Sequence, residues 1–188
     1  MPTTLDAAVR TLSAGGLVVY PTDTLLGLAA RADDPVAVAR LVRAKGRPSG
    51  QPISVLVSST EEIEPIADLS TAARRFVRTR LPGPYTVIVR PSAAVRRRWA
   101  GPIVSPAGTI GVRVPDHPIA RELARRAGPI TATSANRHGE PARRTIADAR
   151  RAFSGAVGGY LAARPAPTGR PSALVDLTGP SPVLLTRR

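Results

Sequence analysis

The stretch PVAVARLVRAKGRPSGQPISVLV, residues 35–57, contains a helical pattern followed by a strand pattern, and helices and strands alternate along the rest of the chain. Proline in the first turn, followed by apolar residues at helical spacing, predicts a helix over residues 35–44. The β-branched run over residues 53–57 predicts a buried strand. Alternating helices and strands are typical of the α/β class, so we expect a mixed sheet with helices on its faces.

The turn inside this stretch contains Lys45, the only lysine among 27 basic residues. A compact ammonium group can reach a single phosphate oxygen in a way that the planar guanidinium group cannot. A second turn, residues 131–139, contains the only asparagine, Asn136. Taken singly, a lysine at a helix end and an asparagine in a turn both have structural explanations. Taken together, they predict one composite site.

The same alternation continues on both sides of residues 35–57. The sequence predicts further helices over residues 5–14, 60–67, 70–80, 117–127 and 145–153. It predicts further strands over residues 17–20, 85–89, 108–115, 129–133, 157–161, 173–177 and 183–185. With neither a repeat nor a linker in this pattern, we expect a single domain over residues 1–188.

Two segments do not fit the alternation. Residues 91–106 form an excursion rich in arginine, alanine and proline around Trp99, which we expect to be mobile or docked on a partner. Residues 164–172 are rich in proline and glycine and predict a lid loop.

Polar residues follow the strand predicted over residues 17–20. Thr22, Asp23 and Thr24 come directly after it, and open α/β sheets bind ligands beyond the carboxyl ends of their strands. A turn that caps itself with its own side chains explains the same residues without a function. Both interpretations stay open at this point.

The composition excludes several classes of protein. A hydrophobic content of 43% predicts a globular chain, and an aromatic content of 3% leaves the core to aliphatic residues. The absence of cysteine excludes disulfides, thiolate catalysis and zinc–thiolate sites. His117 and His138 are too few for a histidine-rich metal centre, and we expect neither to act as a base. Without an N-terminal signal or a bilayer-length apolar run, we expect a soluble cytoplasmic protein with no membrane contact.

The net charge of +14 is concentrated in one part of the chain. Residues 69–115 contain no acidic residue and nine arginines: Arg74, Arg75, Arg78, Arg80, Arg90, Arg96, Arg97, Arg98 and Arg113. Such a block predicts a polyanionic partner, either nucleotide phosphate or nucleic acid. A genome that favours arginine codons, together with a solvated face, explains part of the excess.

Five segments in register resemble the YrdC/TsaC family of threonylcarbamoyl-AMP synthases. They are YPTDT (20–24), KGRP (45–48), LPGPYT (81–86), GTIGVRVP (108–115) and ATSAN (132–136). The order and spacing match the single-domain form of the family from residue 15 to about residue 187. The resemblance implies a twisted, open, mixed α/β sheet with helices on its faces and a basic concave face.

The resemblance also implies a reaction. Members combine L-threonine, bicarbonate and ATP, with Mg²⁺, to give threonylcarbamoyl-AMP and pyrophosphate. The product feeds the threonylcarbamoylation of adenosine 37 in tRNA, so the implied partners are the tRNA-modification proteins that accept it. Direct contact with RNA is left open. No metal ligands are implied among the side chains of the chain itself.

The resemblance assigns roles to particular residues. Lys45 and Arg47 would bind the triphosphate, and Ser134 and Asn136 would donate neutral hydrogen bonds; these four are the implied catalytic residues. Thr109 and Arg187 would also contact ATP. The threonine pocket would consist of Thr22, Thr24, Arg113, Thr133 and Ser172. Because a guanidinium binds carboxylates in bidentate fashion, Arg113 is the expected partner of the threonine carboxylate, although it could also be one more arginine of a basic strand.

The chain departs from the family pattern at four positions. Leu26 replaces a tyrosine that is common there, Ala29 a glycine, Leu56 a histidine found in some relatives, and Ala173 the threonine of a late Ser-Thr pair. These changes affect the expected stacking of adenine and the affinity for threonine more than the phosphate chemistry.

Two alternatives remain from the sequence. One is an RNA-binding or ribosome-maturation factor that uses the same basic concave face. The scarcity of aromatic residues argues against recognition of single strands by stacking, but contact with structured RNA stays open. The other is a relative that adenylates a different carbamate.

Overall fold

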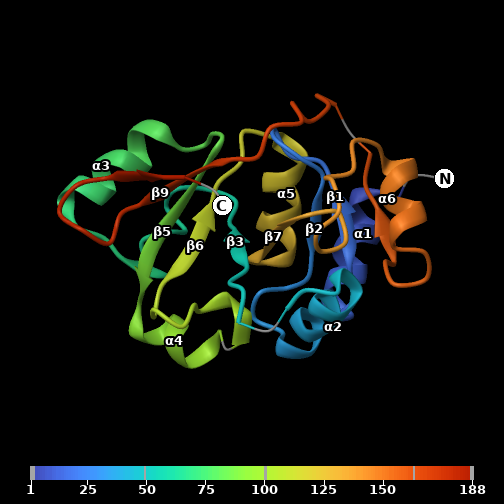
Figure 1. The fold of residues 1–188 in the computed structure, drawn as a ribbon, viewed down its shortest axis with the longest axis horizontal. Helices are drawn as coiled ribbons and strands as arrows, with labels where there is room; N and C mark the ends of the chain where they lie inside the picture. The colour runs from blue at the N-terminus through green and yellow to red at the C-terminus, as the bar shows by residue number, and fades with distance from the viewer. Residues whose placement is uncertain (1–2, 49, 100, 163, 187–188) are drawn as a thin grey trace.

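A mixed β-sheet organises the computed structural model, which describes residues 3–48, 50–99, 101–162 and 164–186 (Figure 1). Its strand order is β10-β9-β5-β6-β3-β7-β2-β1-β8, and β4 pairs with β5. Three neighbouring pairs, β1–β8, β3–β6 and β5–β9, are parallel and the remaining pairs are antiparallel. The mixed sheet expected from the sequence is confirmed.

The elements have the following bounds. The strands are β1 Val18–Tyr20, β2 Gly27–Ala29, β3 Ser54–Leu56, β4 Ala67–Asp68, β5 Tyr85–Pro91, β6 Ile110–Arg113, β7 Ile130–Ser134, β8 Gly159–Tyr160, β9 Ala173–Asp176 and β10 Val183–Leu185. The helices are α1 Leu5–Ser13, α2 Pro35–Lys45, α3 Thr71–Arg80, α4 Ala93–Arg98, α5 Pro118–Ala127 and α6 Ile146–Ala152, with a 3₁₀ turn at Gly101–Ile103. In the described part of the chain, none of these helices is long and apolar enough to cross a bilayer.

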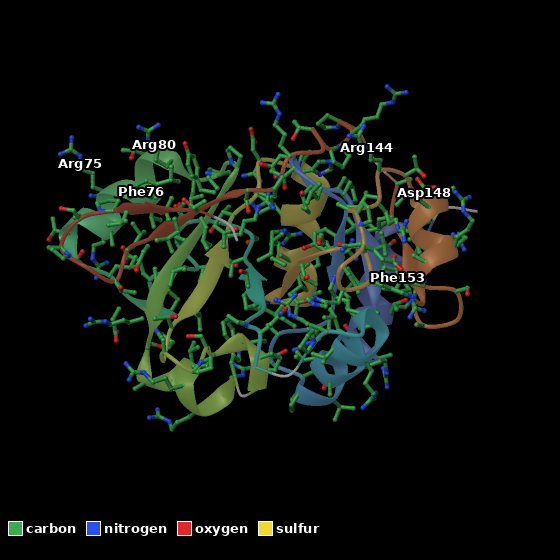
Figure 2. The ribbon with its side chains drawn as sticks, viewed as in Figure 1. Arg75, Phe76, Arg80, Arg144, Asp148 and Phe153 are labelled. Carbon is green, nitrogen blue, oxygen red and sulfur yellow. The ribbon has the colours of Figure 1, made fainter. Side chains whose placement is uncertain are left out.

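Along its strand order the sheet has two halves, which we call its sides and which meet at β3. On the side of β1, β2, β7 and β8, both faces are covered (Figure 1). Helices α1 and α5 pack on one face through Leu12 and Leu123. Helices α2 and α6 lie on the other face, where Leu41 and Phe153, the residue directly after α6, belong to one buried hydrophobic cluster (Figure 2).

On the side of β5, β6 and β9, one face of the sheet packs against the core. Val87, Val112 and Val175 belong to a hydrophobic cluster that includes Val77 of α3. Because side chains alternate along a strand, their neighbours point to the opposite face. Thr86 and Arg113 are on that opposite face, outside the cluster. Polar side chains are thus placed on a sheet surface beside β3.

The position of Lys45 follows from how α2 begins and ends. The Asp34 side chain caps the helix by accepting hydrogen bonds from the backbone N–H groups of residues 36 and 37, and Pro35 occupies its first turn. Gly46 ends it in the left-handed conformation, with φ of 60°. This stop leaves Lys45 as the last helical residue, with its side chain directed into the protein at 3% exposure.

Residues 60–67 do not form the helix that we predicted. They form turns at 61–66, followed by β4. Pro65 explains the difference, because proline lacks a backbone donor and disrupts a helix interior. The Glu62 carboxylate accepts hydrogen bonds from the backbone N–H and the hydroxyl of Ser58, which lies before the predicted helix.

Residues 91–99 and 101–106 are not the mobile or partner-docked excursion that we expected, because they pack into the core of the chain itself. Within them, α4 begins at a Ser92 cap and is followed by the 3₁₀ turn. Val95, Trp99 and Ile103 are all buried in the main hydrophobic cluster, and Trp99 is only 3% exposed. Their spacing of four residues is a helical pattern, which the surrounding arginines and prolines obscured.

Strand β2 was not predicted, and its first residue shows why the strands pack so closely there. Gly27 pairs with Tyr20 of β1, and a Cβ atom at this glycine would lie 2.5 Å from the tyrosine ring. A strand that contains glycine has weak propensity, yet only glycine allows this close approach.

Candidate active site

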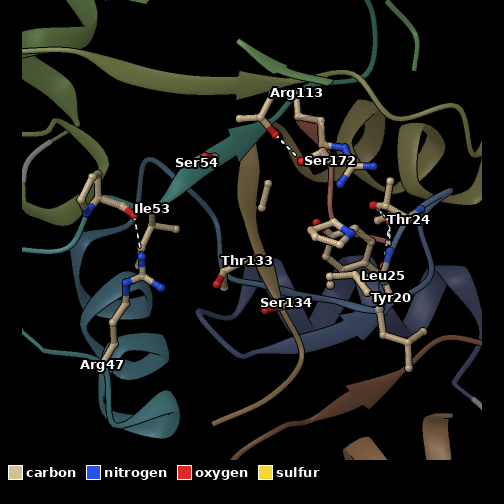
Figure 3. Close-up of a pocket in the computed structure, with 17 residues that line it drawn as sticks. Tyr20, Thr24, Leu25, Arg47, Ile53, Ser54, Arg113, Thr133, Ser134 and Ser172 are labelled. Carbon is tan, nitrogen blue, oxygen red and sulfur yellow. Dashed lines mark hydrogen bonds between the residues drawn. The ribbon is translucent and has the colours of Figure 1, made fainter. Parts of the chain in front are cut away.

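A cavity of about 240 Å³ lies where the two sides of the sheet meet (Figure 3). It is lined by residues from six separate segments of sequence. These are Tyr20, Thr22, Thr24, Leu25, Leu26 and Gly27; Arg47, Pro52, Ile53 and Ser54; Thr86; Arg113; Ala132, Thr133 and Ser134; and Pro171 with Ser172. Figure 3 shows Arg47 on one side, Arg113, Ser172 and Thr24 on the other, and Thr133 and Ser134 between them.

Seven residues that the sequence singled out therefore line one cavity. They are Thr22, Thr24, Arg47, Arg113, Thr133, Ser134 and Ser172. Three others are described but do not line it: Lys45, Thr109 and Asn136. Arg187 lies outside the described residues.

Lys45 lies next to the cavity and contacts the turn that follows β7. Its ammonium group donates hydrogen bonds to the backbone carbonyl oxygens of Ser134 and Asn136, the second over 2.7 Å. In return, the backbone N–H of His138 donates to the carbonyl oxygen of Lys45 over 2.8 Å. Burial, reinforced by the charge of Arg47, lowers the pKa of Lys45 to about 8. The two turns that contain the rare residues are thus in direct contact.

The Asn136 side chain is engaged within its own turn. Its amide nitrogen donates to the carbonyl oxygens of Arg137 and Glu140, over 2.8 and 2.7 Å. Among the described residues, the buried amide oxygen of Asn136 has no hydrogen-bond partner. In this conformation the donors that we expected to face a ligand stabilise the turn. His138, beside it, is exposed.

Arg47 is half-buried at the edge of the cavity, and its guanidinium is held by backbone oxygens. It donates to the carbonyl oxygens of Gln51 and Pro52, over 3.3 and 2.7 Å. Burial lowers the pKa of this guanidinium. A cation held in place by neutral groups keeps its full charge for an anionic ligand.

The segment after β1 forms a compact network of hydroxyl groups. The hydroxyl groups of Thr22 and Thr24 lie 3.0 Å apart, and that of Thr22 also donates to the Leu25 carbonyl over 2.7 Å. The Thr22 oxygen accepts from the backbone N–H groups of Thr24 and Leu25. The turn does cap itself, as the structural interpretation expected, and it also lines the cavity.

Arg113 forms a buried ion pair with Asp23 at the end of β6. Asp23 is a residue whose role the sequence did not predict. Near this pair, the Tyr20 hydroxyl donates to the carbonyl oxygen of Thr131 over 3.1 Å, and burial raises the pKa of Tyr20. The sequence signal for Asp23 was its position between two predicted ligand residues.

Residues 164–172, which we call the strap, cross over the segment that follows β1. The backbone N–H groups of Thr168 and Gly169 donate to the carbonyl oxygens of Asp23 and Thr24, over 3.2 and 2.8 Å. At the end of the strap, the hydroxyl groups of Ser172 and Thr86 lie 2.8 Å apart. The predicted lid loop is therefore bonded to the cavity wall.

The other end of the strap contacts His117. This histidine is fully buried, and its Nε2 atom lies 3.2 Å from the Pro165 carbonyl oxygen. Burial lowers the pKa of His117. Its contacts agree with the structural role that the sequence suggested.

Thr109 belongs to a different part of the sheet. Its hydroxyl lies 2.8 Å from that of Ser105, and it lines a separate cavity of about 550 Å³ with Ile88 and Arg90. Among the described residues there is no group of three or more His, Cys, Asp or Glu side chains that could hold a metal ion.

The chain is an α/β protein whose mixed sheet contains a polar, arginine-lined cavity, and the charge of this cavity suits a small anionic ligand. The comparisons with known proteins agree. The family model Sua5/YciO/YrdC, described as telomere recombination, matches residues 10–188, and the chain belongs to this family. The resemblance stated from the sequence is thereby confirmed.

Relatives and solved structures support this assignment. The threonylcarbamoyl-AMP synthase of Chromohalobacter salexigens is 36% identical over 179 residues, which cover 90% of each chain. The crystal structure of Pyrococcus abyssi Sua5 with L-threonine matches 96% of this chain at 33% identity, with a TM-score of 0.86. This chain spans about half of that protein, 53% of its length. Escherichia coli YciO matches with a TM-score of 0.84 and 26% identity, over 97% of this chain and 88% of its own. The twisted, open sheet that we expected is confirmed by these structures.

Proposed function

We propose that this chain is a threonylcarbamoyl-AMP synthase that uses L-threonine, bicarbonate and ATP. One observation carries the proposal: seven residues assigned to threonine or ATP from the sequence line a single cavity. The name of the Chromohalobacter relative and the bound threonine of Sua5 support the same activity. They support the synthase and not the RNA-binding alternative.

The reaction has two steps, and both involve anions. The threonine amine bonds to the carbon of bicarbonate and releases water, which gives a carbamate. An oxygen of the carbamate then attacks the α-phosphorus of ATP, and pyrophosphate leaves. Because two anions must approach each other, the site has to neutralise charge and hold the reactants in line.

We assign one end of the cavity to threonine and the other end to the triphosphate of ATP. On one side, Arg113 would bind the threonine carboxylate, with Thr22, Thr24, Thr133 and Ser172 around the amino acid. On the other side, Arg47 would neutralise the triphosphate, with Ser134 as a neutral donor. Lys45 would support the phosphates from behind the turn after β7, and Thr109, Asn136 and Arg187 remain proposed contacts to ATP.

Mg²⁺ fits this site as a companion of ATP. The described residues offer no cluster of acidic ligands, and Mg²⁺ usually keeps its waters and binds through the phosphates of its nucleotide. Bound in that way, it would neutralise phosphate charge.

The proposal extends beyond the reaction itself. Threonylcarbamoyl-AMP made here would pass to the tRNA-modification proteins of the cytoplasm. Direct contact of RNA with the basic face, and the organisation of residues 1–188 as one domain, stay predictions.

Pyrophosphate release from ATP tests the proposal. We expect release that requires both bicarbonate and L-threonine, with L-serine and glycine supporting far less. Release with another amino acid instead would favour the relative that adenylates a different carbamate. No release, together with tight and salt-sensitive RNA binding that survives Lys45→Ala, would favour the RNA-binding alternative.

A further inference from the structure

Asp23 and Arg113 form an ion pair at the wall of the cavity. Their side chains are only 14% and 9% exposed. Arg113 lines the cavity, whereas Asp23 does not. The acid therefore contacts the guanidinium from outside the space that a ligand would fill.

The pairing leaves part of each group unused. The acceptor atom of the pair is Asp23 Oδ1 and the donor is Arg113 Nη2. Within the described structure, Asp23 Oδ2 and Arg113 Nε are buried without a hydrogen-bond partner. A buried guanidinium needs a nearby anion, because an unpaired charge is costly to bury. Asp23 supplies that anion while Arg113 keeps an unfilled donor.

The backbone of the same residue contacts the strap. The Asp23 carbonyl oxygen accepts from Thr168 N–H over 3.2 Å, and the next carbonyl, of Thr24, accepts from Gly169 N–H over 2.8 Å. Asp23 is thus bonded to the strap through its main chain and to Arg113 through its side chain. Two parts of the cavity wall that are distant in sequence meet at this residue.

From these contacts we infer that Asp23 is a positioning residue. It holds the guanidinium of Arg113 ready for the carboxylate of an amino-acid substrate and links that guanidinium to the strap. A substrate carboxylate then binds a guanidinium that is fixed from behind, and binding also orders residues 164–172. Identifying this substrate as threonine rests on the proposed function.

The alternative is a purely structural role, in which Asp23 only neutralises the buried charge of Arg113. In that case its loss lowers stability but leaves substrate affinity alone. Asp33 provides the matched control, because its side chain is 10% exposed and pairs with Arg31 and Arg98 away from the cavity.

Threonine kinetics separate the two roles. We expect Asp23→Asn to raise the KM for L-threonine by about tenfold, which corresponds to about 1.4 kcal/mol, because the guanidinium of Arg113 loses its charged hydrogen-bond partner. The KM for ATP should change by less than about twofold. Asp23→Glu should restore part of the affinity, and Asp33→Asn should leave both KM values unchanged. An unchanged threonine KM in folded Asp23→Asn protein would overturn the inference.

A double-mutant cycle tests whether Asp23 acts through Arg113. We expect Asp23→Asn/Arg113→Ala to bind threonine as weakly as Arg113→Ala alone, in an equilibrium binding assay without ATP. Losses of affinity that add up would mean that the two residues act independently, and would contradict a positioning role.

Amide hydrogen exchange tests the link to the strap without any reaction. In ligand-free protein, exchange at Thr168 and Gly169 should be faster in Asp23→Asn than in wild type, and equal to wild type in Asp33→Asn. Saturating L-threonine should slow exchange there in wild type, and less in Asp23→Asn. If wild type binds no amino acid, the proposed function fails while the ligand-free comparison still decides the link. Equal ligand-free exchange in Asp23→Asn and wild type would refute the link.

Discussion

The ammonium group of Lys45 lies 2.7 Å from the backbone carbonyl oxygen of Asn136. These are the only lysine and the only asparagine of the chain. A second hydrogen bond, to the carbonyl of Ser134, fixes the turn at the point where it enters the cavity wall. The lysine therefore shapes the phosphate end of the cavity by holding this turn, in addition to supplying charge.

Replacement of Lys45 by arginine should reduce turnover by at least about a hundredfold. The guanidinium is larger and planar, and the lysine is only 3% exposed. Overpacking a buried position also costs stability, about 1–3 kcal/mol. Steady-state pyrophosphate release and urea unfolding measure the two effects.

Arg43→Ala is the matched control, because Arg43 is an exposed residue in the same last turn of α2. It should leave turnover and stability unchanged. A fully active Lys45→Arg enzyme would show that the site does not require a compact ammonium group.

The affinity for ATP should fall above about pH 8. Burial lowers the pKa of Lys45 from 10.5 to about 8, and phosphate anions favour the protonated form. We therefore expect the Kd for ATP to be flat below pH 8 and to rise by about tenfold per pH unit above it. Calorimetric titrations from pH 7 to 9.5 measure this. Lys45→Met should show no such rise, and identical pH profiles for both proteins would contradict the assignment.

The same shift predicts how stability depends on pH. Between about pH 8 and 10.5, the unfolded chain keeps the Lys45 proton and the folded chain has lost it. The contribution of this group to the free energy of unfolding therefore rises with pH in that window. The difference between wild type and Lys45→Met in urea unfolding at pH 7.5 and pH 10 isolates it, and no change in this difference would exclude the predicted shift.

Ser172→Ala should raise the KM for L-threonine by about fivefold, because the strap loses a hydrogen bond worth about 1 kcal/mol. The variant also leaves the buried hydroxyl of Thr86 without its 2.8 Å partner. Adding Thr86→Val should recover stability, because it removes that unsatisfied group, but the KM should remain raised. Thr79→Ala is the control, because in the described structure the Thr79 hydroxyl donates to carbonyl oxygens of its own helix, α3. An unchanged KM in Ser172→Ala would show that the strap does not affect threonine binding.

Trp99→Ala should lower the free energy of unfolding by about 3–5 kcal/mol, as expected for a large aromatic residue removed from a core. Arg97→Ala, at an exposed position of α4, should change it by less than about 0.5 kcal/mol. Urea denaturation compares the two. Equal stabilities would mean that residues 91–106 do not contribute to the core.

Elements with strong periodicity could be predicted from the sequence. Helix α2 has helical apolar spacing and capping residues, and strands β5 and β7 have clear apolar runs. All three occur where we expected them. The failures have physical causes. At residues 60–67 the helical spacing was outweighed by Pro65, and at Gly27 a tertiary contact with Tyr20 overrode weak strand propensity.

The site was predictable only in part. Thr22 and Thr24 could be inferred from their position directly after a strand. The resemblance to the family supplied the other residues that line the cavity, Arg47, Arg113, Thr133, Ser134 and Ser172. Asp23 and Thr86 could not, because their roles depend on partners that only tertiary structure supplies, Arg113 and Ser172. The engagement of the Asn136 amide within its own turn was likewise invisible in the sequence.

The order of the strands has a consequence for synthesis. The cavity is completed by Pro171 and Ser172, directly before β9, which pairs with β5. At the opposite end of the sheet, β1 receives its neighbour β8 only after most of the chain has been made. During translation, the cavity therefore cannot be complete until Pro171 and Ser172 have been synthesised. Binding of substrate would then stabilise only chains that extend through β9. Shorter products would remain exposed to proteolysis.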